Sequence, residues 1–159
     1  WPLWPPGPDT DRPSAMNSNL LYAAALVALT VAVHAAGLAA VLQLFSSSRQ
    51  AQLPTRFWPT TWLLVRATWF LLLIHLAAIT VWALFFWWKE CLPDAESAFY
   101  FSGVTYATIG YGDLVLKEPW RLLAPVEGLT GILMCGLSAG FYFALVSRIV
   151  ASRMQVKPG

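Results

Sequence analysis

The sequence predicts an all-α membrane protein with three transmembrane helices, and with a short re-entrant helix and a glycine-rich loop between the second and the third. Of the 159 residues, 58% are hydrophobic and 11% are charged, whereas a soluble domain carries roughly 25% charged residues. The hydrophobic residues gather in three long runs, and about 20 residues suffice to cross a hydrocarbon core of roughly 30 Å. A further apolar stretch is too short to cross, which indicates a re-entrant segment.

The first membrane span is predicted over residues 20–45. This run contains His34 and Gln43 but no formal charge. It is too long for the core of a signal peptide and lacks the basic start and cleavage pattern of one. Residues 1–19 are rich in proline and show no periodicity, so we expect an extended or disordered extracellular lead-in.

The second span is predicted over residues 62–88, after a polar connection at 46–61. Arg66 lies close enough to the start of this span for its guanidinium to reach the headgroups. His75 lies near the middle. The far end, residues 82–88, is rich in tryptophan and phenylalanine, which is typical of a membrane interface.

A short helix is predicted over residues 95–107, because acidic residues follow Pro93 in the manner of a helix start. It runs directly into the sequence TIGYGD at residues 108–113. The third span is predicted over residues 120–150, and a short tail follows at 151–159. Backbone within hydrocarbon must be hydrogen-bonded or shielded from lipid. One chain can hardly enclose the re-entrant segment, so the sequence predicts an oligomer around a shared axis.

The basic residues that flank the spans predict the orientation in a multi-pass protein of the cell membrane. Neither the 46–61 connection nor the 151–159 tail contains an acidic residue. The basic residues in or next to these two segments are Arg49, Arg56, Arg66, Arg148, Arg153 and Lys157. Positive residues favour the cytoplasmic side. We therefore expect both segments in the cytoplasm and the N-terminus outside.

The hexapeptide TIGYGD, preceded by FSGVTYA, resembles the pore of the potassium channel family, and the resemblance covers roughly residues 82–147. It implies a homotetramer with fourfold symmetry that conducts K⁺ passively across the lipid bilayer. Residues 62–150 would be the pore module, with the short helix as pore helix and residues 108–113 as selectivity filter. The first span resembles the extra helix of small bacterial members. The resemblance implies no organic cofactor and no nucleic-acid partner.

The resemblance also implies which atoms hold K⁺: the main-chain carbonyls of Thr108, Ile109, Gly110 and Tyr111, together with the Thr108 hydroxyl. Successive carbonyls point at one axis only if the backbone alternates its conformation. Glycine reaches left-handed φ without Cβ strain, so Gly110 and Gly112 suit such a loop.

Residues around the filter are expected to support it. Tyr100 and Phe101 occupy positions where the family often has aromatic residues around the filter. Tyr100 is expected to hydrogen-bond Asp113, and Tyr111 to pack outward against the short helix. Val104 stands where some members of the family have a glutamate partner for the aspartate.

Three features of the spans have two interpretations each. Glu127 either binds cations near the outer cavity or supports the filter from behind, paired with Arg121 or a filter amide; the second is favoured. Gly131 is a candidate hinge, or a site of close helix packing. His34 and His75 are expected at similar depth, as packed neutral residues bonded to each other or to a neighbour, or as pH sensors.

Other function classes find little support. The net charge of +2 without a basic stripe does not suggest nucleic-acid binding. Cys91 and Cys135 are expected to be unpaired thiols without a metal cluster. No catalytic constellation or phosphate loop indicates an enzyme, and the first span lacks the repeated arginines of a voltage sensor. The alternatives that stay open are a weakly selective cation channel and a non-conducting membrane subunit or sensor with the pore fold.

Overall fold

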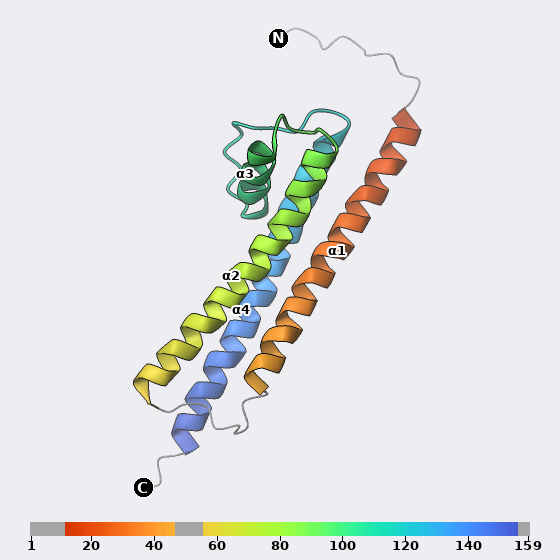
Figure 1. Ribbon diagram of the computed structural model, residues 1–159. Coiled ribbons are helices and arrows are strands. Elements are labelled where there is room, and N and C mark those ends of the chain that lie inside the picture. Colours follow the sequence, from red (N-terminus) through yellow and green to blue (C-terminus); the bar gives the residue numbers. More distant parts are fainter. Residues whose placement is uncertain (1–11, 47–55, 156–159) are drawn as a thin grey trace, which may run out of the picture.

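The computed structural model describes residues 12–46 and 56–155, and these residues form helices and connecting loops without a strand (Figure 1). The elements are α1 (Arg12–Ser46), α2 (Phe57–Trp88), α3 (Ala95–Tyr106), the 3₁₀ turn η1 (Trp120–Leu122) and α4 (Leu123–Gln155). The protein is therefore all-helical in its described part.

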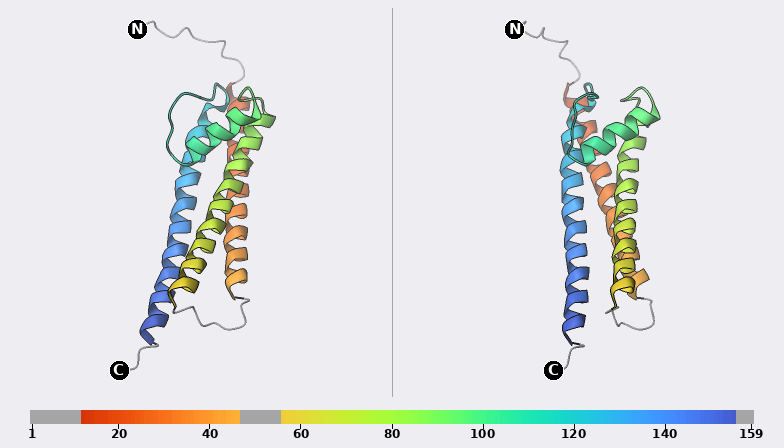
Figure 2. Two further views of the ribbon diagram at one scale, coloured as in Figure 1. Left: turned by 60° about the vertical axis from the view of Figure 1, so that its left-hand side comes forward. Right: turned by 90° about the vertical axis from the view of Figure 1, so that its left-hand side faces the viewer.

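Three of the helices are long and apolar enough to cross a membrane, as the sequence predicts. These membrane-length stretches are Ser18–Leu44, Phe57–Trp88 and Trp120–Ser152. The helices α1, α2 and α4 run side by side along the length of the molecule, and the short α3 lies at one end beside α2 and α4 (Figures 1 and 2). The chain returns from α3 to that same end before α4 begins (Figure 2).

The prediction that residues 1–19 are extended is wrong for residues 12–19, which belong to α1. Pro13 lies in the first turn of this helix, where its missing N–H breaks no helical hydrogen bond. The Asn19 amide donates a hydrogen bond of 2.7 Å to the Pro119 carbonyl and ties this part of α1 to the loop before η1. Residues 1–11 of the predicted lead-in lie outside the described residues.

Helices α2 and α4 extend further than predicted at the end of the bundle far from α3. Helix α2 begins at Phe57 rather than residue 62, and α4 continues to Gln155 rather than ending at 150. Membrane helices extend beyond the hydrocarbon core when their ends are polar or aromatic, so hydropathy alone sets these limits too short. Residues 47–55 of the predicted connection and 156–159 of the predicted tail lie outside the described residues.

The main hydrophobic core lies where α3 meets the three long helices. Trp82 and Phe86 of α2 are fully buried there, next to Phe101 of α3 and Leu123 of α4. The rings of Phe86 and Phe101 meet edge to face, with centroids 5.5 Å apart, a favourable arrangement for aromatic pairs. This core fixes α3 against α2 and so determines where the following loop begins.

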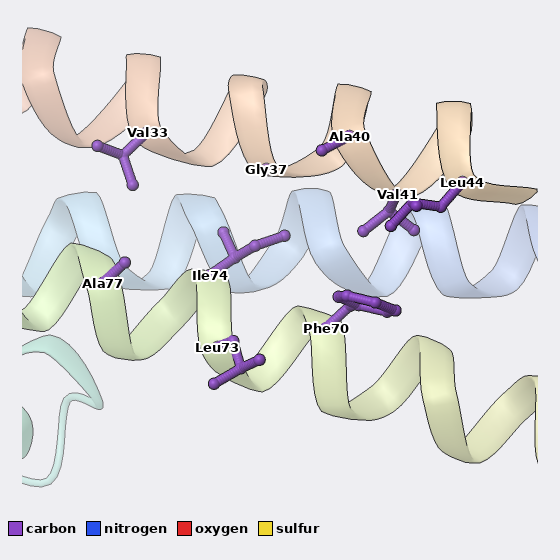
Figure 3. Close-up of a pocket in the computed structure, with 9 residues that line it drawn as sticks. All are labelled: Val33, Gly37, Ala40, Val41, Leu44, Phe70, Leu73, Ile74 and Ala77. Atoms are coloured by element: carbon purple, nitrogen blue, oxygen red, sulfur yellow. The ribbon is translucent and has the colours of Figure 1, made fainter.

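An apolar cavity of about 270 Å³ lies between α1 and α2, towards the end of the bundle away from α3 (Figure 3). The nine residues labelled in Figure 3 line it, and all of them are apolar. Gly37 allows α1 to approach α2 here, because a Cβ at this position would lie 2.5 Å from the Ile74 side chain. The cavity offers no polar side chain that would hold an ion.

Candidate functional site

Helix α3 has a well-defined start, as the sequence predicts. Asp94 precedes the helix in an extended conformation, and its carboxylate accepts a 2.7 Å hydrogen bond from the Ser97 backbone N–H. Such a cap satisfies one of the N–H groups that the first turn leaves without a helical partner. The Ser97 hydroxyl donates to the second carboxylate oxygen at 3.1 Å. The first turn is thereby fixed at the same end of the bundle as the C-terminus of α2.

The C-terminal end of α3 turns the chain sharply into the TIGYGD loop. Thr108 adopts a left-handed φ of 59°, and its N–H bonds the Thr105 carbonyl at 2.9 Å. The Ile109 N–H bonds the Val104 carbonyl at 2.8 Å. These two bonds form a Schellman motif, in which the left-handed position usually belongs to glycine. A threonine there is strained, and strain of this kind concentrates at functional sites.

The loop after α3 alternates in backbone handedness. Positive φ values occur at Thr108 (59°), Gly110 (55°) and Gly112 (78°), which are every second residue. Ile109 and Tyr111 lie between them and are 54% and 69% exposed. In the single chain Tyr111 is largely exposed, and its expected packing against α3 stays a prediction. The whole loop stands open on one side of the chain.

Two aromatic residues of α3 secure the loop in different ways. The Tyr100 hydroxyl donates a 2.8 Å hydrogen bond to the Asp113 carboxylate, which is the contact expected from the sequence. The pKa of Tyr100 lies above its ordinary value mainly because of this bond. Phe101 is buried in the core against Phe86. Phe101 thus holds α3 in place.

Glu127 lies behind α3 and not on an open surface. It is fully buried, and the Ser102 hydroxyl of α3 donates a 2.5 Å hydrogen bond to its Oε1. The partner is Ser102 rather than the expected Arg121 or a filter amide, and Arg121 is exposed. The position favours the supporting interpretation of Glu127 over the cation-binding one. Ser102 was missed because nothing in the sequence relates it to a residue on the third span.

Gly131 is a contact point between α4 and the end of α3. A Cβ at this position would lie 2.0 Å from the Tyr106 carbonyl oxygen and 2.8 Å from its carbon. Helix α4 runs without interruption through this position. The geometry therefore favours close helix packing over the candidate hinge.

His34 and His75 lie together in the middle of the bundle, with ring centroids 5.2 Å apart. They do not bond each other directly, because the Ser138 hydroxyl joins their Nε2 atoms at 3.3 and 3.0 Å. The Nδ1 atom of His75 lies 3.2 Å from the Tyr106 hydroxyl. Sequence reasoning missed Ser138 and Tyr106, although both are polar groups in otherwise apolar segments and such groups require partners.

No group of histidine, cysteine and acidic side chains within residues 12–46 and 56–155 is arranged to hold a metal ion. Cys91 is half-buried and Cys135 is exposed, and both are free thiols. Burial raises the pKa of the Cys91 thiol to about 11. The loop after α3 offers main-chain oxygens and the Thr108 hydroxyl, and the Asp113 carboxylate at its end is bonded by Tyr100.

Comparison with known proteins places this arrangement in a family. A family model described as "Ion channel" matches residues 69–148, half of the chain. The chain belongs to the ion channel family. The matched part of this ion channel comprises most of α2 and α4 with α3 and the loop between them, and α1 precedes it as an additional membrane-length helix. No curated protein and no solved structure matches the chain.

Proposed function

We propose that this ion channel is potassium-selective, and that residues 108–113 are its filter. The main observation in support of this proposal is the alternation of φ in this loop. In an ordinary strand, successive residues point to opposite sides. Left-handed φ at every second residue turns successive carbonyls towards one side, and the open positions of the loop leave that side free. Rings of such carbonyls, with the Thr108 hydroxyl at the inner end, replace the hydration shell of K⁺.

The exposure of the loop supports an assembly of four copies around a shared axis. Residues 107–113 are exposed in the single chain, and bare backbone does not face lipid within a membrane. Identical neighbours related by rotation close a ring in which each loop faces the axis. The C-terminal end of α3 carries partial negative charge, which favours a cation beside it. In this proposal α3 is the re-entrant pore helix, and K⁺ is the permeant ligand with no organic cofactor.

The orientation proposed from the sequence fits this arrangement. The N-terminal end of α2 and the C-terminal end of α4 lie opposite the filter loop (Figure 1), and Arg56 precedes the first while Arg148 lies near the second. The preference of basic residues for the cytoplasm would place that end inside the cell and the filter mouth outside. Accessibility of a cysteine introduced at Lys117, in the loop before η1, tests this: an impermeant thiol reagent should label it from the outside.

Reconstitution into liposomes tests the function. Under opposing K⁺ and Na⁺ gradients, the reversal potential of the wild-type protein should lie close to the K⁺ equilibrium potential. A reversal potential near zero would indicate the weakly selective cation channel, and absence of any flux would indicate the non-conducting subunit. Native mass spectrometry should show four copies.

Two glycine variants distinguish the effect of backbone conformation on conduction from the effect of added side-chain volume. A Cβ at Gly110 or at Gly103 meets no atom within 4 Å in the chain, but only Gly110 of the two has a positive φ. Gly110→Ala should abolish selective conduction because alanine disfavours left-handed φ by roughly 1–2 kcal/mol, whereas Gly103→Ala should retain it. Selective flux of wild-type size in Gly110→Ala would contradict the filter assignment.

A further inference from the structure

Four polar side chains, one from each helix, form a continuous line of hydrogen bonds in the apolar middle of the bundle. The order is His34 of α1, Ser138 of α4, His75 of α2 and Tyr106 of α3. The bonds measure 3.3, 3.0 and 3.2 Å in that order. His34, Ser138 and Tyr106 are 1%, 6% and 2% exposed, and His75 is partly buried. Tyr106 is the last residue of α3, two positions before Thr108.

The bridge at Ser138 limits the tautomers of the two histidines. A hydroxyl has one hydrogen and two lone pairs, so Ser138 either donates to one Nε2 and accepts from the other, or accepts from both. In the first case, the ring that accepts carries its hydrogen on Nδ1, and the ring that donates carries one on Nε2. In the second case both rings carry hydrogen on Nε2, and the Ser138 hydrogen and the His34 Nδ1 lone pair are both left without a partner.

The direction of the line follows from the groups left without a partner. If the Tyr106 hydroxyl donates to His75, His75 donates to Ser138 and Ser138 donates to His34, then only the Nδ1–H of His34 is unpartnered. In the reverse direction, the Tyr106 hydrogen and the His34 Nδ1 lone pair would both be unpartnered. The Nδ1 atom of His34 has no hydrogen-bond partner in the described part of the chain. The first direction leaves fewer buried groups unsatisfied and is therefore favoured.

We propose that this line is a relay through which α1 and α4 position the end of the pore helix, and through it the filter. The inference rests on the proposed function and adds to it a role for α1, which lies outside the region matched to the family. His34, Ser138 and His75 are positioning residues that act through Tyr106. The line is cooperative because its two inner members, His75 and Ser138, each accept one bond and donate the next. Removing the His34 side chain should therefore change the hydrogen bond between His75 and Tyr106, although His34 and Tyr106 do not bond each other.

Nitrogen-15 NMR of the histidine rings in bilayers tests the relay without any measurement of conduction. The chain contains two histidines, so a His34→Gln sample assigns both. At neutral pH we expect His75 to carry its hydrogen on Nε2 and His34 on Nδ1. Tyr106→Phe should disturb the His34 signals as well as those of His75, and Ser138→Ala should make the two rings independent. Equal tautomers in the wild type, or His34 signals unchanged in Tyr106→Phe, would overturn the proposal.

A double-variant comparison of K⁺ flux tests whether the relay acts on the filter. His34→Leu and Tyr106→Phe should each lower flux by about two- to tenfold, and the pair together should lower it no further than the stronger single variant. His34→Gln, which keeps an acceptor for Ser138, should recover flux that His34→Leu loses. Tyr142→Phe, outside the relay, serves as the control.

Variant samples are compared at equal amounts of assembled protein, measured by native mass spectrometry. Fold-changes that multiply in the double variant, or equal flux in His34→Gln and His34→Leu, would overturn the role of the relay in positioning. Failure of the wild type to conduct K⁺ would instead contradict the proposed function, and the NMR result would still stand on its own.

Discussion

Replacing Gly131 by alanine tests whether close packing of α4 against α3 holds the proposed filter in place. The new Cβ would lie 2.0 Å from the Tyr106 carbonyl oxygen, and this neighbour is backbone rather than a flexible side chain. To reach the 3.4 Å of an ordinary contact, the two backbones must separate by about 1.4 Å. The side chain of Tyr106 holds the 3.2 Å hydrogen bond with His75, and moving the Tyr106 backbone away by this distance would stretch that bond beyond hydrogen-bonding range.

The expected change in the free energy of unfolding of Gly131→Ala follows from two opposing effects. Overpacking of a well-packed site destabilises by roughly 1–3 kcal/mol, and contact with backbone argues for the upper end. Alanine in place of glycine within a helix favours the helix by about 1 kcal/mol. Gly131→Ala should therefore destabilise the assembled protein by about 2 kcal/mol. Gly136→Ala on the same helix meets no atom within 4 Å and should keep most of the helix-propensity gain.

The assay is thermal unfolding of the reconstituted protein, followed by tryptophan fluorescence and by loss of the assembled species, with K⁺ flux measured on the same samples. We expect Gly131→Ala to unfold at a lower temperature than the wild type and to conduct poorly, and Gly136→Ala to unfold at or above the wild-type temperature. A hinge at Gly131 would give the opposite result, namely a stiffer and equally stable helix with altered gating. Equal stability of Gly131→Ala and Gly136→Ala would refute the packing argument.

Three further predictions concern the filter loop and its surroundings. Thr108→Gly should relieve the left-handed strain and stabilise the loop by roughly 1 kcal/mol. Because it removes the hydroxyl, it should also lose K⁺ selectivity. Thr108→Ser keeps the hydroxyl and should retain selectivity in reversal-potential measurements. In a Cys135→Ser background, iodoacetamide should modify Cys91 at a rate that rises about tenfold per pH unit, because a pKa of about 11 leaves roughly one thiolate in a thousand at pH 8; a rate that levels off below pH 9 would contradict this. Tyr100→Phe removes the bond to Asp113 and should speed the decay of K⁺ current under sustained recording; unchanged decay would show that this bond does not hold the filter.

The sequence predicts the parts of the fold that depend on local pattern. Hydropathy predicts the three spans, and Asp94 predicts the start of α3. The contact between Tyr100 and Asp113 is expected from the resemblance to the potassium channel pore, and the structure shows it. The first turn of α1 is missed because Pro13 is taken as a sign of extended chain, although proline is well tolerated at a helix start.

Contacts between residues far apart in the sequence are the ones that pattern does not predict. Glu127 requires a partner, but only the packing of α4 on α3 identifies Ser102. The two histidines are expected at the same depth, yet the atom that joins them comes from Ser138 on another span. Tyr111 is largely exposed in the single chain, and only an assembly of several copies, as proposed above, would provide neighbours for it.

The contacts of α1 argue against its being a passive membrane anchor. It bonds the loop before η1 through Asn19, the middle of the bundle through His34, and α2 through the close approach of Gly37 to Ile74. These three points run from residue 19 to residue 37 of the membrane-length stretch Ser18–Leu44. An anchor needs contacts to lipid only, whereas a buried histidine that must be satisfied by another span is costly to keep without a use. Helix α1, which lies outside the matched region, is therefore packed into that region, and its removal would leave Ser138 without one of its two hydrogen bonds.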